Sequence, residues 1–154
     1  MVLIIGAGLI GTSIGLALTQ QGHLVHLQDR TSSHALVAAS LGAGSVDQPA
    51  NVALVIVAVP PAATGRAVIH ALREYPTATV TDVASVKSAI AEQVGRGGVD
   101  ATRYVGSHPM AGSHRSGPLT ARPDLFVDRT WVIAPTDLAD PARVDEIRGL
   151  ALSC

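Results

Sequence analysis

Cysteine is almost absent from this sequence, and so is lysine. The only cysteine, Cys154, stands at the last position, so no internal disulfide is possible and the chain fits a reducing compartment, for which we expect the cytoplasm. Lys87 is the only lysine among many arginines, which makes its position worth following. The formal net charge is -1 at pH 7, so nothing in the charge favours nucleic acid or an anionic membrane as a partner.

Charged side chains are missing from the N-terminal part of the chain, where Asp29 is the first. An uncharged stretch of this length can be a signal peptide or a membrane span. However, no basic residue precedes the apolar run, and glycines recur at positions 6, 8, 11 and 15. These features favour a buried strand, a turn and a helix over a membrane segment.

Short apolar runs alternate with longer helical patterns along the whole chain. The predicted strands cover residues 2–5, 24–28, 53–59, 78–83, 103–107 and 130–135. The predicted helices cover residues 9–21, 33–42, 62–74, 86–95 and 140–152. The strands are continuously apolar, as in sheets with both faces covered by helices. This order predicts a single α/β domain with a doubly wound, mainly parallel sheet.

The first predicted strand runs into a glycine-rich turn, G-x-G-x-x-G, formed by Gly6, Gly8 and Gly11. Gly6 allows the tight turn, Gly8 lets the backbone approach a pyrophosphate, and Gly11 lets helix and strand pack closely. The N–H groups of Leu9 and Ile10 would then point at the phosphates from the start of a helix. A buried strand before the turn and an apolar helix after it predict a Rossmann-type dinucleotide site; a purely structural turn is the alternative.

Asp29 stands at the end of the second predicted strand, where a carboxylate can bind the ribose hydroxyls of adenosine. Because a carboxylate there repels a 2′-phosphate, NAD is favoured over NADP. Arg30 and the two hydroxyl residues after it could hold that phosphate, which keeps NADP as the alternative. Val59 and Pro60, at the end of the third strand, are predicted to form an apolar wall beside the cofactor.

Two further segments reach the same edge of the predicted sheet. The stretch "TDVASVKSAI" places Ser85 just after a strand and Lys87 at the start of a helix. A serine there is most often a helix N-cap, so capping is the alternative role for Ser85. The stretch "YVGSHPMAGSHRSGP" places His108 just after another strand. His108 differs from a loose surface histidine because the strand end fixes its position and Pro109 stiffens the backbone after it.

Taken together, "GAGLIGTSIG", "VAVPP", "DVASVK" and "GSHPMAGSHRSGP", followed by "LF" and "WVIAP", resemble the nucleotide-binding domain of prephenate dehydrogenases. Arogenate dehydrogenases are close relatives of this family. The resemblance covers almost the whole chain. It implies NAD-dependent oxidative decarboxylation of prephenate to 4-hydroxyphenylpyruvate and CO2, a step of tyrosine biosynthesis, with arogenate as the alternative substrate.

The resemblance also implies the roles of two residues. His108 would bind the ring hydroxyl of the substrate and accept its proton as hydride leaves. Ser85 would hydrogen-bond the same region of the substrate and the nicotinamide side. A neutral imidazole can take a hydroxyl proton at neutral pH, and a serine hydroxyl can orient both partners without adding charge. Aromatisation and loss of CO2 drive the reaction, so no metal is expected.

The segment 104–118 is rich in glycine and proline, which we expect to shape a rigid loop that carries His108 over the nicotinamide. His114 and Arg115, in the same loop, are predicted to reach the substrate. Some members of the family have a glutamate where this sequence has His114, a departure that bears on substrate preference and pH dependence.

Members of this family continue into a helical domain that forms a homodimer and supplies an arginine for the substrate's carboxylate. The last helical pattern here begins well, with Asp140 and Pro141, but no stop signal or strand follows it. We therefore expect residues 1–154 to be the nucleotide-binding domain of a longer homodimeric protein, weakly active or inactive by itself.

Two other functions stay open. Another Rossmann-type dehydrogenase, such as an imino-acid reductase or a β-hydroxyacid dehydrogenase, would use a lysine on a helix, for which Lys87 is available; the "SHPMAG" loop would then be unexplained. A module that senses NAD without chemistry would carry the same glycine turn, but it would have no use for His108 and Ser85.

Overall fold

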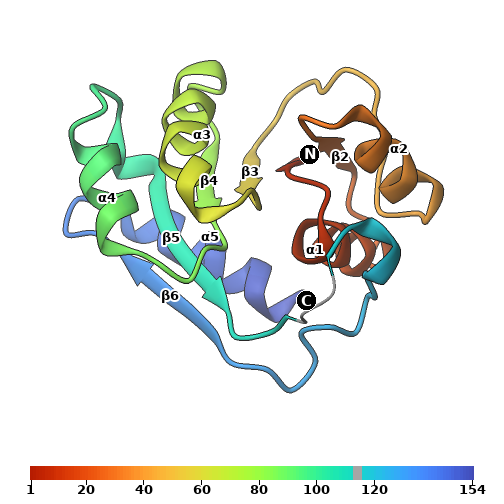
Figure 1. The fold of residues 1–154 in the computed structure, drawn as a ribbon. Helices are drawn as coiled ribbons and strands as arrows, with labels where there is room; N and C mark the ends of the chain where they lie inside the picture. Colours follow the sequence, from red (N-terminus) through yellow and green to blue (C-terminus); the bar gives the residue numbers. More distant parts are fainter. Residues whose placement is uncertain (113–115) are drawn as a thin grey trace.

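The computed structural model describes residues 1–112 and 116–154 (Figure 1). Its strands are β1 (Val2–Ile5), β2 (Val25–Gln28), β3 (Leu54–Val57), β4 (Thr79–Asp82), β5 (Tyr104–Pro109) and β6 (Trp131–Pro135). Its helices are α1 (Leu9–Gln20), α2 (Ser32–Ser40), α3 (Pro61–Glu74), α4 (Ser88–Gly95) and α5 (Pro141–Leu152), with short 3-10 turns η1 (Ala101–Arg103) and η2 (Pro118–Thr120). The predicted order of strands and helices is confirmed, and their ends differ from the prediction by no more than two residues.

The strands form one six-stranded sheet in the order β2-β1-β3-β4-β5-β6. Neighbours from β2 to β5 run parallel, whereas β6 pairs antiparallel with β5. The chain therefore winds outward from β1 in one direction through β2 and in the other through β3, β4 and β5. The reversal lies between β1 and β3, and the carboxyl edge beside such a reversal is where open α/β sheets bind ligands.

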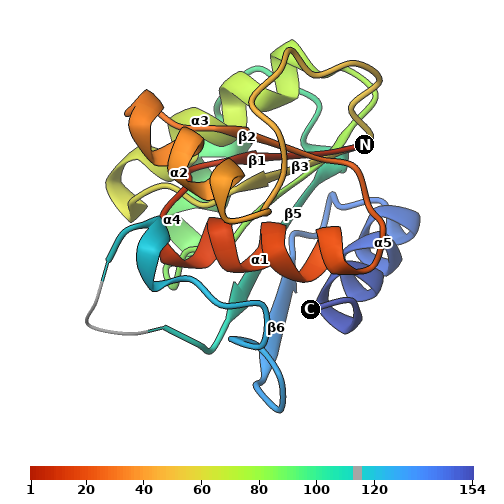
Figure 2. The ribbon, with the colours of Figure 1, turned by 90° about the vertical axis from the view of Figure 1, so that its right-hand side faces the viewer.

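Helices cover both faces of the sheet (Figures 1 and 2). Helices α1, α2 and α5 pack on one face, and α3 and α4 pack on the other. Each face has its own apolar cluster, and the adjacent β1 residues Leu3 and Ile4 are fully buried in different clusters. Successive side chains of a strand point to opposite faces, so burial on both explains why the strand sequences are apolar throughout.

The uncharged N-terminal stretch folds as β1, a turn and α1, as predicted. In the part of the chain that the structure describes, we find no helix with the length and apolarity needed to cross a membrane.

Arg103 anchors the start of β5 to the end of α3. Its guanidinium donates to the carbonyl oxygens of Leu72 (2.8 Å), Tyr75 (3.0 Å) and Ala78 (3.0 Å). The side chain is only 10% exposed, and Asp100 accepts a further bond at 3.2 Å. Carbonyl groups at the end of a helix lack partners within the helix, so one buried arginine satisfies several at once.

Replacing Arg103 with methionine is expected to lower the free energy of unfolding by about 2–4 kcal/mol, because buried carbonyl groups lose their donors. Urea denaturation followed by circular dichroism measures this loss. The matched control is Arg96→Met. Arg96 is 78% exposed, and within the described residues its one ion pair is with an exposed glutamate on α4, so this substitution should cost less than about 1 kcal/mol. Equal losses in the two variants would contradict the anchoring role.

Candidate functional site

The glycine motif that joins β1 to the first turn of α1 has no room for a side chain at two of its three glycines. Gly6 has φ +107°, and a Cβ there would lie 2.4 Å from the carbonyl oxygen of Ala58. A Cβ on Gly11 would lie 1.9 Å from the carbonyl oxygen of Gly6. Gly8 differs, because a Cβ there would meet nothing within 4 Å. The turn is therefore closed toward the sheet by Gly6 and Gly11 and open at Gly8, where a ligand can approach the backbone.

Helix α1 begins at this turn without a capping side chain. Gly8 is the N-cap residue, and no side-chain cap bond is present among the described residues. The first N–H groups of a helix have no partner inside it, and they attract negative charge. Leu9 and Ile10 occupy the first two helical positions. Their N–H groups are thus donors suited to a phosphate.

Asp29 follows β2 and accepts a hydrogen bond from the backbone of the glycine turn. One carboxylate oxygen accepts the Ala7 N–H at 2.7 Å, and the other accepts the Thr31 N–H at 2.8 Å. The Nδ1 atom of His34 lies 3.8 Å from that second oxygen. A carboxylate has about four acceptor positions, so Asp29 keeps capacity for hydroxyl groups of a ligand. Its side chain is 15% exposed, which leaves it accessible from the cavities beside it.

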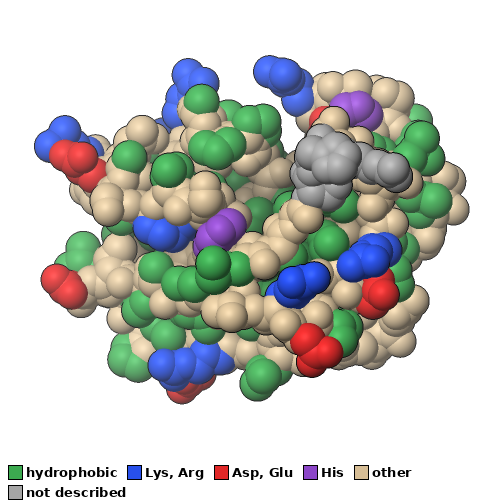
Figure 3. All heavy atoms as spheres, turned by 60° about the horizontal axis from the view of Figure 1, so that its bottom comes forward, with side chains coloured by type: hydrophobic (Ala, Val, Ile, Leu, Met, Phe, Trp, Pro, Cys, Tyr) green, Lys and Arg blue, Asp and Glu red, His purple; other side chains and the backbone are tan. Residues whose placement is uncertain are grey.

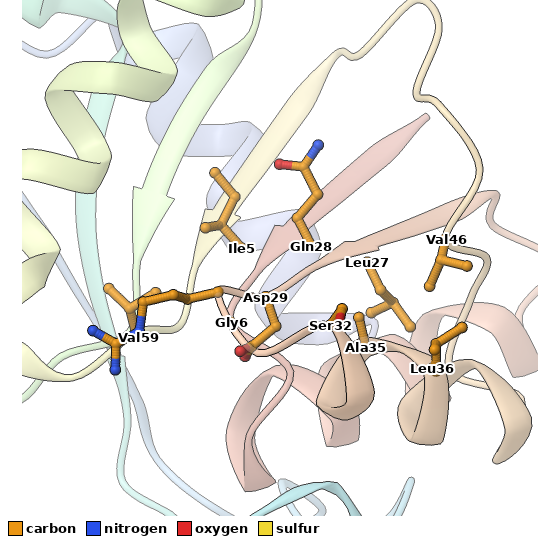
Figure 4. Close-up of a pocket in the computed structure, with 11 residues that line it drawn as sticks. Ile5, Gly6, Leu27, Gln28, Asp29, Ser32, Ala35, Leu36, Val46 and Val59 are labelled. Carbon is orange, nitrogen blue, oxygen red and sulfur yellow. The ribbon is translucent and has the colours of Figure 1, made fainter.

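Two adjoining cavities, of about 600 and 930 Å³, meet at this carboxylate. Both are lined by Gly6, Asp29, Arg30 and Val59. The smaller one continues over apolar side chains, and Figure 4 shows Leu27, Ala35, Leu36 and Val46 gathered on one side of Asp29, with Val59 on the other.

The larger cavity extends over the helix start and the opposite wall of the site. Besides the shared residues it is lined by Gly8, Leu9, Pro60 and Gly112, among others. Of the predicted cofactor residues, the structure thus brings all except Ile10 and Gly11 to the walls of these cavities; Gly11 instead lies against the turn. Two adjoining, partly apolar cavities beside a helix N-terminus suit a dinucleotide.

His108 lies within β5 rather than just after it, which corrects the predicted strand end. The β5–β6 pairing continues through His108↔Val132 to Pro109↔Trp131. Antiparallel pairing with a strand that comes later in the chain therefore extends β5 by two residues beyond the predicted 103–107. His108 is held by strand pairing on one side, which is a firmer support than a loop.

The His108 ring is partly buried, and among the described residues it makes one hydrogen bond. Its Nδ1 atom lies 3.2 Å from the carbonyl oxygen of Val83, in the loop after β4. A carbonyl oxygen can only accept, so Nδ1 carries the proton in this bond. In the neutral ring Nε2 is then without a proton and can accept one.

Ser85 lies exposed in the same loop, between β4 and α4. The alternative in which Ser85 caps the helix is wrong, because α4 begins at Ser88 and Lys87 occupies the N-cap position without a side-chain cap bond. Among the described residues the Ser85 hydroxyl has no hydrogen-bond partner, so a ligand could bind it there. His114 and Arg115 lie outside the described residues.

A buried polar cluster beneath this loop was missed by the sequence-based assignment. Asp82 is fully buried and accepts hydrogen bonds from the Tyr104 hydroxyl (2.7 Å), the Ala84 N–H (2.9 Å) and the Lys87 ammonium. The same ammonium donates to the carbonyl oxygen of Ser107 at 2.7 Å. The isolated lysine in "DVASVK" was the one signal that could have led to the cluster.

The pKa shifts in this cluster follow from its burial. Burial lowers the pKa of the Lys87 ammonium, and the bond to Asp82 opposes that shift. Burial, together with the charge of Asp82, raises the pKa of Tyr104, so its hydroxyl stays protonated and donates.

Exposed hydrophobic side chains lie next to the end of β5 and on its partner strand β6. Figure 3 shows hydrophobic side chains spread among other residues over the face that comes forward from the bottom of Figure 1. Val86, Met110 and Val132 are 48%, 58% and 40% exposed, and they come from the loop after β4, the residue after β5, and β6. Met110, two residues after His108, and Val132, its strand partner, thus offer an apolar surface beside the histidine.

The whole sequence is similar to known dehydrogenases. The family model described as "Prephenate dehydrogenase, nucleotide-binding domain" matches residues 14–154. The chain is 38% identical over 152 residues to the probable prephenate dehydrogenase NovF of Streptomyces niveus, covering 98% of this chain and 42% of that protein. It is 30% identical to the prephenate dehydrogenase of Bacillus subtilis (strain 168), covering 97% and 43%. The chain spans about two fifths of the length of these relatives.

Solved structures share the fold. The arogenate dehydrogenase of Synechocystis superposes with a TM-score of 0.86 at 29% identity, covering 97% of this chain and 55% of that one. A putative prephenate dehydrogenase from Corynebacterium glutamicum does so with a TM-score of 0.86 at 31% identity, covering 99% and 52%. The A. aeolicus prephenate dehydrogenase in complex with hydroxyphenyl propionate and NAD+ has a TM-score of 0.86 at 24% identity, covering 99% and 56%, which shows a common fold.

The different surroundings of two glycines in the turn give a direct test of its geometry. Gly11→Ala is expected to lower the free energy of unfolding by at least about 2 kcal/mol, because its Cβ would collide with a backbone carbonyl group. Gly8→Ala is expected to change it by less than about 1 kcal/mol, because the position is open and its φ of -85° suits alanine. Thermal and urea unfolding of the two variants measure the difference. Similar losses would contradict the open and closed sides of the turn.

Proposed function

Because the chain belongs to the family of prephenate dehydrogenase nucleotide-binding domains, we propose that it is the NAD-binding part of an enzyme that converts prephenate to 4-hydroxyphenylpyruvate and CO2. The observation that carries the proposal is the hydrogen bond from Nδ1 of His108 to Val83, which leaves Nε2 free to accept a proton. The relatives extend well beyond the matched region, so the activity belongs to a whole protein of that length. By resemblance, that protein is a cytoplasmic homodimer.

The two cavities fit NAD. The apolar cavity beside Asp29 takes the adenine, and the Asp29 carboxylate accepts from the ribose hydroxyls. The pyrophosphate lies at the open Gly8 position, against the free N–H groups at the start of α1. NAD is favoured over NADP because the carboxylate would repel a 2′-phosphate, and the A. aeolicus structure with NAD+ agrees with this choice.

His108 performs the proton transfer, and residues near it hold the ring. When bound, NAD supplies the acceptor for the hydride that leaves the substrate carbon bearing the hydroxyl. Nε2 of His108 takes the hydroxyl proton and returns it to the phenol oxygen once CO2 has left and the ring is aromatic. Ser85 orients the same hydroxyl region, and the apolar side chains of Val86, Met110 and Val132 contact the ring and exclude water.

Arogenate is the second candidate substrate, favoured by the similarity to the Synechocystis arogenate dehydrogenase. Prephenate and arogenate have the same ring and hydroxyl and differ in the side chain, which carries a carbonyl group in one and an amine in the other. His108 and Ser85 act on the shared part, so they serve either substrate. Assays with prephenate and with arogenate show which of them the whole protein uses.

In the whole protein, His108→Asn is expected to lower kcat roughly 10²–10⁴-fold, because the proton acceptor is lost. NADH formation with prephenate, with arogenate and with buffer alone measures this, and NAD binding should be unchanged. The control is His70→Asn, an exposed histidine on α3, which should match the wild type. If neither substrate yields NADH, or if both variants match the wild type, the proposed function fails.

Asp29→Asn is expected to improve the binding of NADP relative to NAD, because the charge that repels the 2′-phosphate is removed. The ratio of the Kd for NADP to the Kd for NAD should fall about tenfold. The amide keeps an oxygen that can accept the Ala7 N–H, so the turn should persist. Calorimetric titration of this chain with each dinucleotide gives both constants, with Asp137→Asn, an exposed aspartate outside both cavities, as the control. Equal affinity of the wild type for both would overturn the preference for NAD.

A further inference from the structure

The backbone ladder between β4 and β5 ends before the residues that carry the chemistry. Its last pair is Asp82↔Gly106. Beyond it, side chains join the two segments: the Ser107 hydroxyl donates to the Asp82 carbonyl oxygen at 2.9 Å, and the His108 ring bonds the Val83 carbonyl oxygen at 3.2 Å. The position of His108 relative to the loop after β4 therefore depends on side chains.

The Asp82 carboxylate fixes the peptide group to which the His108 ring is bonded. The Ala84 N–H, which donates to Asp82 at 2.9 Å, and the Val83 carbonyl, which accepts from His108, belong to the same peptide bond. A peptide bond is planar, and in the trans form its N–H and C=O point in opposite directions. Because Asp82 holds one end of this peptide group, the other end is aimed at His108.

Lys87 fixes a second peptide group, the one between Ser107 and His108. Its ammonium donates both to the Asp82 carboxylate and to the carbonyl oxygen of Ser107, which belongs to the peptide bond that enters His108. A Cβ on Gly106 would lie 3.1 Å from the Tyr104 hydroxyl and 3.3 Å from the side chain of Lys87, so the glycine leaves room for both. The ring and the backbone of His108 are thus held by one buried cluster.

We infer that Asp82 and Lys87 are positioning residues that set the tautomer of His108: by aiming the Val83 carbonyl at Nδ1, they keep the proton there and leave Nε2 as the base. The tautomer of a neutral histidine is set by the hydrogen bond that its protonated nitrogen makes. An acceptor aimed at Nδ1 therefore determines which nitrogen faces the substrate. The use of Nε2 as a base rests on the proposed function, whereas the tautomer does not.

The tautomer can be measured on this chain without substrate. At pH 8.5 an ordinary imidazole is neutral, and long-range 1H–15N correlation spectra distinguish a protonated from an unprotonated ring nitrogen. The signals of His108 are assigned by their loss in His108→Asn. We expect the Nδ1–H form to predominate in the wild type. A wild-type ring with the proton on Nε2 overturns the inference by itself.

Variants of the cluster test the cause. Lys87→Gln and Asp82→Asn are expected to raise the Nε2–H fraction at least threefold, Lys87→Arg less, and the surface control Arg96→Gln not at all. Circular dichroism checks that each variant is folded; if Asp82→Asn does not fold, Lys87→Gln and Lys87→Arg carry the test. An unchanged tautomer in a folded Lys87→Gln variant overturns the inference.

Kinetics of the whole protein then separate positioning from a loss of stability. Lys87→Gln is expected to lower kcat at least tenfold while leaving the KM for NAD within twofold, because the cofactor cavities do not include Lys87. A parallel loss of NAD binding contradicts a positioning role. Failure of the wild type to use either substrate refutes the proposed function and leaves the tautomer result intact.

Discussion

Burial of one carboxylate controls how Ser85 and His108 are arranged in the candidate site. Asp82 is removed from water, so it requires donors, and a buried aspartate without them would be strongly destabilising. The donors come from β5, from the loop after β4 and from the start of α4. Meeting this requirement brings the loop with Ser85 and the strand with His108 together, although more than 20 residues separate them in the chain.

The two ends of the site are built on the same principle. Asp29 and Asp82 each lie at the carboxyl end of a parallel strand, and each accepts a backbone N–H of the loop that follows its strand. Asp29 remains partly exposed beside the cavities and can bind a ligand, whereas Asp82 is enclosed and acts on other residues. In the proposed function the first carboxylate recognises the cofactor, and in our inference the second positions His108.

Features that depend on local sequence were predictable. The alternation of apolar runs and helical patterns gave the order of the strands and helices, and the glycine turn gave the start of α1, because only glycine fits at Gly6 and Gly11. Features that depend on distant contacts were not. The extension of β5 to Pro109 requires pairing with β6, and the cluster of Asp82, Lys87 and Tyr104 requires side chains from three segments to meet. In the sequence, Asp82 reads as an ordinary strand end.

If His108 is the proton acceptor, Nε2 must carry no proton when the reaction begins. The most direct measurement is the pH dependence of kcat/KM for prephenate in the whole protein, with wild type and His108→Asn compared. The predicted result is a wild-type rate that falls tenfold per pH unit at the acid end, with that dependence lost in the variant. A wild-type rate that does not fall toward acid pH, or a fall that persists in the variant, would contradict the role of His108.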